Sequence, residues 1–183
     1  MGLLVAFAPF LVFALVDRFV TPLTGLIAAA LTAAALLLRD VLIAHRPVKI
    51  LEACTMLLFG GLSVYVLVVH PLWSIVEIRL IVDAGLLLIV VASLALRRPF
   101  TLAYAREQTP PEIWSKPAFV QVNYVITGVW ALAFAIVVAA DVLMAFATHI
   151  PTWVGIMVTV AALMGALKFT GWYPVRSRSR LPA

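Results

Sequence analysis

The chain is a series of long apolar runs separated by short polar segments. A helix needs roughly 20 mostly apolar residues to cross a hydrocarbon core about 30 Å thick. Six runs meet or approach that length, at about residues 2–16, 23–38, 48–69, 74–96, 118–147 and 152–172. The pattern predicts an all-α fold, a polytopic membrane helical bundle of six transmembrane helices. We expect one transmembrane domain over residues 1–173, followed by a short basic tail at 174–183.

The first two runs are the shortest, and the polar segment Asp17-Arg-Phe-Val-Thr-Pro22 joins them. Adding Phe19 and Val20 lengthens the first run enough to span. Asp17 and Arg18 can then extend their side chains to the interface. A re-entrant hairpin formed by the two runs is the alternative.

Composition places the chain in a membrane. Apolar residues make up 65% of it and charged residues 11%, which leaves too little polar surface for a soluble domain of 183 residues. The net charge of +5 is explained by anionic lipid at one membrane face. We therefore expect membrane lipids, and not nucleic acid, as partners.

The basic residues set the orientation, because positively charged loops are retained in the cytoplasm. With the amino terminus inside, eleven of the thirteen Lys and Arg residues fall on the cytoplasmic side, and only Arg18 and Arg79 fall outside. Six spans with both termini in the cytoplasm is the topology that this asymmetry favours. The start, Met-Gly-Leu-Leu-Val, lacks the basic residues of a cleavable signal peptide, so we expect none.

Rows of small residues predict where helices approach one another closely, since lipid supplies no hydrophobic drive for association. The second, third, fifth and sixth runs carry such residues, most of them four apart. They are Gly25, Ala29 and Ala33; Gly60 and Gly61; Thr127, Ala131, Ala135 and Ala139; and Ala161 and Gly165.

The loop between the fourth and fifth runs predicts a short cytoplasmic interfacial helix. Phe100, Ala103, Tyr104 and Glu107 fall on one helical face. Thr109-Pro-Pro-Glu112 then fits a capping box with Thr109 as N-cap. An indole such as Trp114 is expected at the level of the lipid headgroups. The residues expected to contact a partner are Phe100, Tyr104, Trp114, Ser115 and Lys116.

Charged residues within spans are functional candidates, because each costs about 2.5–3.5 kcal/mol at the centre of a span. The candidates are His70, Arg79, Asp83, Glu52 and Asp141. One interpretation is a polar cavity open to the outer side that binds an anionic headgroup or relays protons. The other is a self-contained pair of Arg79 with Asp83, four residues on, with the remaining groups at the interface.

No motif specifies an enzyme, a metal site or a cofactor. The sequence contains no His-Glu-x-x-His helix, no paired cysteines, no phosphate-binding glycine loop and no nucleophile elbow. Haem ligation would need two facing histidines, and only His70 and His149 could meet. The single cysteine, Cys54, cannot form an intramolecular disulfide. We expect no catalytic residue, no metal and no cofactor.

Several short motifs, taken in order, resemble the intracellular septation protein A family of small polytopic proteins of the bacterial inner membrane. They are Phe-Ala-Pro-Phe-Leu-Val-Phe at 7–13, Phe59-Gly-Gly-Leu62, His70, Arg97-Arg98-Pro99 and Trp114-Ser-Lys116. The resemblance covers about Pro9 to Trp172. The chain differs from the family at Glu77 and Arg79, where the family tends to have lysines, and over residues 100–107. It would therefore be a divergent member.

The resemblance implies a non-enzymatic inner-membrane protein that acts as a scaffold or accessory factor for a cell-envelope or septation complex, through contacts with other inner-membrane proteins. The alternative, drawn from the residues themselves, is a small carrier or lipid-handling protein that uses a polar site around Arg79 and Asp83. Six short spans are few for a single-chain carrier, so the alternative calls for a homodimer.

Overall fold

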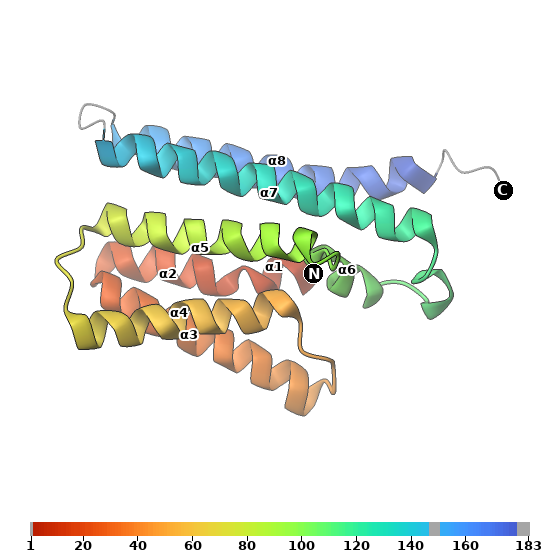
Figure 1. The fold of residues 1–183 in the computed structure, drawn as a ribbon, viewed down its shortest axis with the longest axis horizontal. Helices are drawn as coiled ribbons and strands as arrows, with labels where there is room; N and C mark the ends of the chain where they lie inside the picture. The colour runs from red at the N-terminus through yellow and green to blue at the C-terminus, as the bar shows by residue number, and fades with distance from the viewer. Residues whose placement is uncertain (1, 147–150, 179–183) are drawn as a thin grey trace. The chain divides into compact units, whose positions relative to one another are not determined.

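The computed structural model describes residues 2–146 and 151–178, and these residues contain helices and no strand. The chain divides into two compact units, Met1–Gly85 and Leu86–Ala183. In chain order the elements are α1 (Gly2–Ala6), α2 (Ala8–Phe19), α3 (Pro22–Leu38), a π-helix η1 (Arg39–Ile43), α4 (Ile50–Val69), α5 (Ile75–Ala95), α6 (Phe100–Arg106), a 3-10 helix η2 (Pro111–Ile113), α7 (Pro117–Phe146) and α8 (Thr152–Arg178) (Figure 1).

Four of the described helical segments are long and apolar enough to cross a membrane. They are Pro22–Ile43, Ile50–Val69, Pro117–Phe146 and Trp153–Arg176. The all-α prediction is confirmed, and so is the placement of these four spans to within a few residues at most ends. The remaining two of the six expected spans, over α1–α2 and α5, stay predictions. The helix α8 also runs on to Arg178, so the first half of the segment expected as a tail is helical.

The first expected span is interrupted, which the sequence analysis did not foresee. The chain leaves the helix at Phe7, between α1 and α2. Pro9 lies at the start of α2 and has no N–H to donate, and its ring would clash with the carbonyl four residues before it in a continuous helix. The result is a helix of 5 residues followed by one of 12. Neither piece alone has the length of a span.

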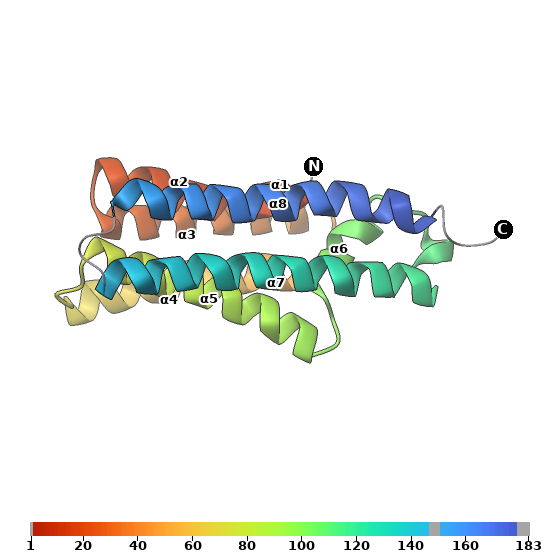
Figure 2. The same cartoon turned by 90° about the horizontal axis from the view of Figure 1, so that it is seen from above.

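In the first unit, α3 packs against both α2 and α4 (Figures 1 and 2). A capping box starts α3: the Thr21 hydroxyl accepts from the Thr24 N–H, and the Thr24 hydroxyl accepts from the Thr21 N–H. The centre of the unit is a cluster of buried apolar side chains from four helices, namely Phe13, Leu26, Ala29, Phe59, Ile78 and Val82. Rings pack edge to face within it, with the Phe10 and Phe59 centroids 4.9 Å apart.

Small residues create the seam between α2 and α3 that their spacing predicted. Gly25, Ala29 and Ala33 are all buried. A Cβ on Gly25 would lie 3.1 Å from both the Cβ and the backbone nitrogen of Asp17, so any other residue here would push α2 and α3 apart by a few tenths of an ångström.

Most of the other small residues expected at seams do not pack inside the chain, although Thr127 of the α7 row is fully buried. Ala135 and Ala139 on α7 are exposed, as are Ala161 and Gly165 on α8. A Cβ built on Gly60 or Gly61 would meet nothing within 4 Å. On α7 the buried face is instead formed mainly by larger residues: Asn123, Ile126, Thr127, Trp130, Ala133, Phe134, Val137 and Asp141. Spacing of small residues alone does not reveal which face of an entirely apolar helix turns inward.

The exchange of Gly25 for alanine provides a direct test of the close approach of α2 and α3. We expect Gly25→Ala to lower the free energy of unfolding by about 1–3 kcal/mol, because the added methyl forces the helices apart. Gly61→Ala is the matched control, since its Cβ enters open space and alanine favours a helix by up to about 1 kcal/mol. Unfolding of both variants in mixed micelles, followed by circular dichroism, gives the comparison. Equal stabilities would contradict the packing argument.

In the second unit, α7 and α8 run antiparallel, side by side (Figures 1 and 2). The buried Trp130 of α7 donates its indole Nε1–H to the Thr170 hydroxyl of α8 at 3.0 Å. Gly155 faces Met144, whose sulfur lies where a Cβ on that glycine would be. The Met144 side chain packed on Gly155 near one end and a hydrogen bond towards the other therefore hold the two helices together.

Candidate functional site

Two ionic clusters lie in the interior of the first unit, and the first joins α2 to α5. The side chain of Asp17 is 0% exposed and that of Arg79 is 30% exposed. Arg79 donates two hydrogen bonds to this carboxylate, from Nε to Oδ2 at 2.8 Å and from Nη2 to Oδ1 at 2.7 Å. This bidentate geometry is the strongest that a guanidinium and a carboxylate form.

The pairing gives Arg79 a partner that the sequence analysis did not name. The sequence suggested Asp83, four residues away on the same helix, as its partner. The carboxylate that it binds through both N–H groups is Asp17, 62 residues earlier in the chain. Arg79 therefore ties α5 to α2.

The second cluster lies where η1 leads into α4. Lys49 is buried and donates to two carboxylates, Asp40 Oδ2 at 2.5 Å and Glu52 Oε1 at 3.0 Å. Arg39, which is about half exposed, donates from Nε and Nη2 to the other oxygen of Asp40. The four formal charges sum to zero, which is the condition under which a buried ionic group is tolerated.

The π-helix η1 has a clear structural effect at this cluster. It continues α3 for one wider turn, and its end is tied back by hydrogen bonds from the Ala44 N–H to the Arg39 carbonyl and from the Arg46 N–H to the Asp40 carbonyl. In this turn the Asp40 side chain is buried while its neighbours are exposed. Single π turns occur in helices often at functional sites.

The other polar candidates are spread over the chain. His70 ends α4 in the left-handed conformation, at φ 49° and ψ 50°, and is exposed. Asp83 is partly buried in α5, and Asp141 is buried in α7 of the second unit. His149, the other haem candidate, lies outside the described residues. Within the described part of the chain, no three His, Cys, Asp or Glu side chains are grouped to hold a metal ion.

The loop between α5 and α7 is ordered by contacts with α7 and with itself. The Thr101 hydroxyl lies 2.8 Å from that of Thr127 and donates to the Asn123 carbonyl at 3.1 Å. The Trp114 indole donates to the Thr109 carbonyl at 3.1 Å, and the Arg106 guanidinium lies 5.7 Å from the Trp114 ring centroid. The loop contains a short helix, α6, as predicted, and its place at the membrane interface stays a prediction.

Two expectations for this loop are corrected. Thr109 does not cap a helix, because its hydroxyl donates back to the Ala105 carbonyl at 2.9 Å and η2 starts after Pro110 without a side-chain cap. Phe100 and Tyr104 were expected to contact a partner, yet each is only 2% exposed. They belong to the interior. Ser115 and Lys116 are exposed and Trp114 is partly so.

Sequence reasoning missed Asp17, Asp40 and Lys49 as members of interior clusters, because all three lie at the ends of apolar runs, where a charged side chain normally reaches solvent. Lys49 precedes Glu52 by three residues, and the two side chains form an ion pair at 3.0 Å. Asp17 and Arg79 lie on different helices, and no local spacing connects them.

A scan against protein-family models and searches of curated proteins and of solved structures find no match for this chain. Its class follows from the structure. Several ionic and polar side chains, among them Asp17, Asp40 and Lys49, are buried, while large apolar residues such as Leu11, Leu31, Leu57 and Leu132 are more than 60% exposed. Apolar exteriors of this extent, on helices long enough to cross a bilayer, define a multi-pass helical membrane protein.

Proposed function

We propose that this protein is a non-enzymatic integral membrane protein that acts as a scaffold or accessory factor, binding other membrane proteins of a cell-envelope complex. The observation that carries the proposal is that charged side chains of the first unit form ion pairs with one another inside the protein. Asp17 and Arg79 bind one another, and Lys49 binds Asp40 and Glu52. We infer that charges paired in this way specify how the helices pack, since a buried pair adds little net stability but is costly to break.

The same observation weighs against the carrier or lipid-handling alternative. That alternative needs Arg79 to exchange between a substrate anion and its resting partner. A bidentate bond to a fully buried carboxylate is an unfavourable starting point for such exchange, because releasing Arg79 leaves the Asp17 charge uncompensated in the interior.

The docking surface in this proposal is the exposed end of the loop before α7, at Trp114, Ser115 and Lys116. Hydrogen bonds from α6 to α7 and the buried rings of Phe100 and Tyr104 hold the loop in place, so a partner would meet a preformed surface. The bacterial inner membrane, both termini in the cytoplasm and a role in the envelope are part of the proposal, and the resemblance to the septation protein A family supports them.

Charge reversal at Lys116 tests the proposal. Lys116→Glu should reduce the yield of proteins that co-purify from gently solubilised native membranes about tenfold, because like charges across an interface are repelled. Arg18→Glu, an exposed reversal in the other unit, is the matched control and should leave the yield unchanged. A Lys116→Glu variant that retains every partner at wild-type stoichiometry would reject this docking surface.

A further inference from the structure

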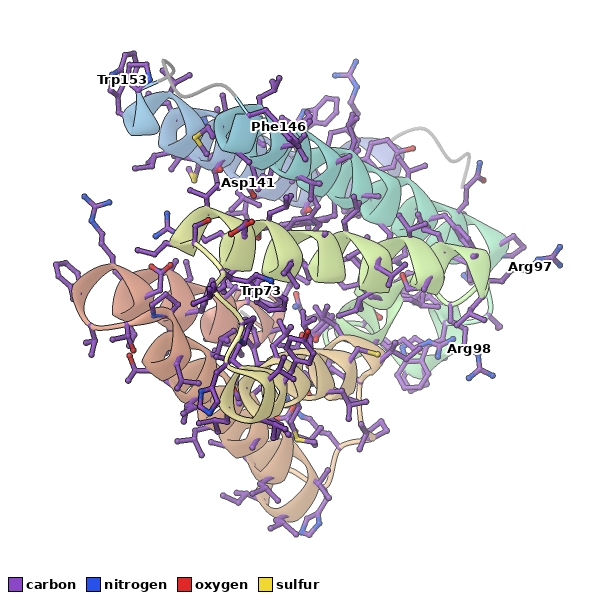
Figure 3. The ribbon with its side chains drawn as sticks, turned by 60° about the vertical axis from the view of Figure 1, so that its left-hand side comes forward. Trp73, Arg97, Arg98, Asp141, Phe146 and Trp153 are labelled. Atoms are coloured by element: carbon purple, nitrogen blue, oxygen red, sulfur yellow. The ribbon has the colours of Figure 1, made fainter. Side chains whose placement is uncertain are left out.

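Exposed aromatic residues mark two levels along the second unit. Phe146, at the end of α7, is 85% exposed, and Trp153, at the start of α8, is 65% exposed (Figure 3). Trp172 is 53% exposed and lies 19 residues further along α8. At 1.5 Å per residue the two tryptophans are about 28 Å apart along the axis, close to the thickness of a hydrocarbon core.

Tryptophans at this spacing are typical of the two aromatic belts that sit at the membrane–water interfaces. The helix α8 continues past Trp172 to Arg178, while at its other end it begins next to Trp153. The portion of the second unit that extends beyond the bilayer therefore lies at the Trp172 end. Because α7 is antiparallel to α8 and α6 packs on the first half of α7, the loop before α7 belongs to this same end.

Two arginine–tryptophan pairs lie at this end of the second unit. The Arg106 guanidinium lies 5.7 Å from the Trp114 ring centroid, and the Arg176 guanidinium lies 5.2 Å from that of Trp172. We call these four residues the basic–aromatic end. Neighbouring rings brace the second pair, since Phe169 stacks on Tyr173 at 4.9 Å and contacts Trp172 at 6.0 Å.

The charge around the basic–aromatic end is positive. Exposed cations there are Arg97, Arg98, Arg106, Lys116 and Arg176, against the exposed carboxylates of Glu107 and Glu112. Arg97 and Arg98 point away from the ribbon (Figure 3). A positive surface at the depth of the lipid headgroups attracts anions, and a guanidinium presents the forked donors that match a phosphate group.

We propose that the basic–aromatic end is a binding site for the phosphate headgroup of an anionic phospholipid. The Trp172 indole lies at the depth where headgroups meet acyl chains, and each of the two indoles holds an arginine beside it. An acidic protein segment is a less suitable ligand than a lipid. It would bind these cations in water, beyond the lipid, where the half-exposed tryptophan ring would have no apolar surroundings. The inference does not depend on the scaffold proposal, since it concerns the purified chain and its lipids alone.

Native mass spectrometry of the whole protein released from nanodiscs tests the inference. The nanodiscs contain equal amounts of phosphatidylglycerol and phosphatidylcholine, which share acyl chains and differ in charge. We expect the wild type to retain phosphatidylglycerol preferentially. Arg106→Gln and Arg176→Gln should each lower that preference about fivefold, the effect of removing one cation near an anionic surface.

Arg18→Gln is the control, because it removes an exposed cation in the other unit and should leave the preference unchanged. Circular dichroism establishes that each variant is folded, and either single arginine variant is sufficient if the other fails to fold. Equal retention of the two lipids by the wild type would overturn the site. A loss with Arg18→Gln as large as that with Arg106→Gln would also overturn it, because attraction would then depend on net charge alone.

Discussion

Replacing Lys49 by methionine should destabilise the protein by about 3–5 kcal/mol, the cost of leaving buried charges without their partner. Lys49 is the ammonium that Asp40 and Glu52 share, and all three side chains are at most 8% exposed. Arg39 still compensates Asp40 in the variant, so most of the cost falls on Glu52. SDS-induced unfolding in mixed micelles, followed by circular dichroism, measures the loss.

Two further variants separate the ionic effect from a loss of packing. Glu52→Gln added to Lys49→Met removes the uncompensated charge and should recover more than half of the lost stability. Lys168→Met, at an exposed lysine of α8, should change stability by no more than about 0.5 kcal/mol. If Lys49→Met is as stable as the wild type, the cluster does not contribute to holding η1 against α4.

The second large effect is expected at Arg79. Arg79→Met should cost about 3 kcal/mol, towards the lower end of the range for buried pairs because Arg79 is itself 30% exposed. The cost arises from Asp17, whose side chain is fully buried and loses both of its hydrogen bonds from the guanidinium. The same unfolding measurement applies.

Arg79→Lys is the informative companion to Arg79→Met. Lysine keeps the charge but cannot form the two parallel hydrogen bonds, so an intermediate stability is expected. The double variant Asp17→Asn with Arg79→Met should be more stable than Arg79→Met alone, because no charge is then left buried. Equal stability of the double variant and Arg79→Met would show that Asp17 is not the group that Arg79 compensates.

The bounds of the helices were largely predictable. The fourth run was expected over 74–96 and α5 covers Ile75–Ala95, while the fifth was expected over 118–147 and α7 covers Pro117–Phe146. The bilayer explains this accuracy, since backbone groups in hydrocarbon must be satisfied within a helix and the helix must match the thickness of the core. The break at Phe7 was missed because hydropathy does not register that Pro9 lacks a donor.

The buried faces and the ionic partners were not predictable in the same way. A helix in lipid is apolar on all sides, so periodicity does not separate the inward face from the outward one, and Ala135 and Ala139 were wrongly assigned to a seam. Arg79 binds Asp17, which lies on another helix 62 residues earlier in the chain, and no local spacing could reveal that partner.

The sequence by itself therefore determined the class of the protein, the segments that form its long helices and the helical start of the loop before α7, because these depend on composition and on local backbone requirements. Only the tertiary structure decided which charges are buried together, at Asp17 with Arg79 and at Asp40, Lys49 and Glu52. Those pairings depend on how neighbouring helices are rotated and how closely Gly25 lets them approach. Packing between segments that are distant in the sequence sets both the rotation of the helices and their distance from one another.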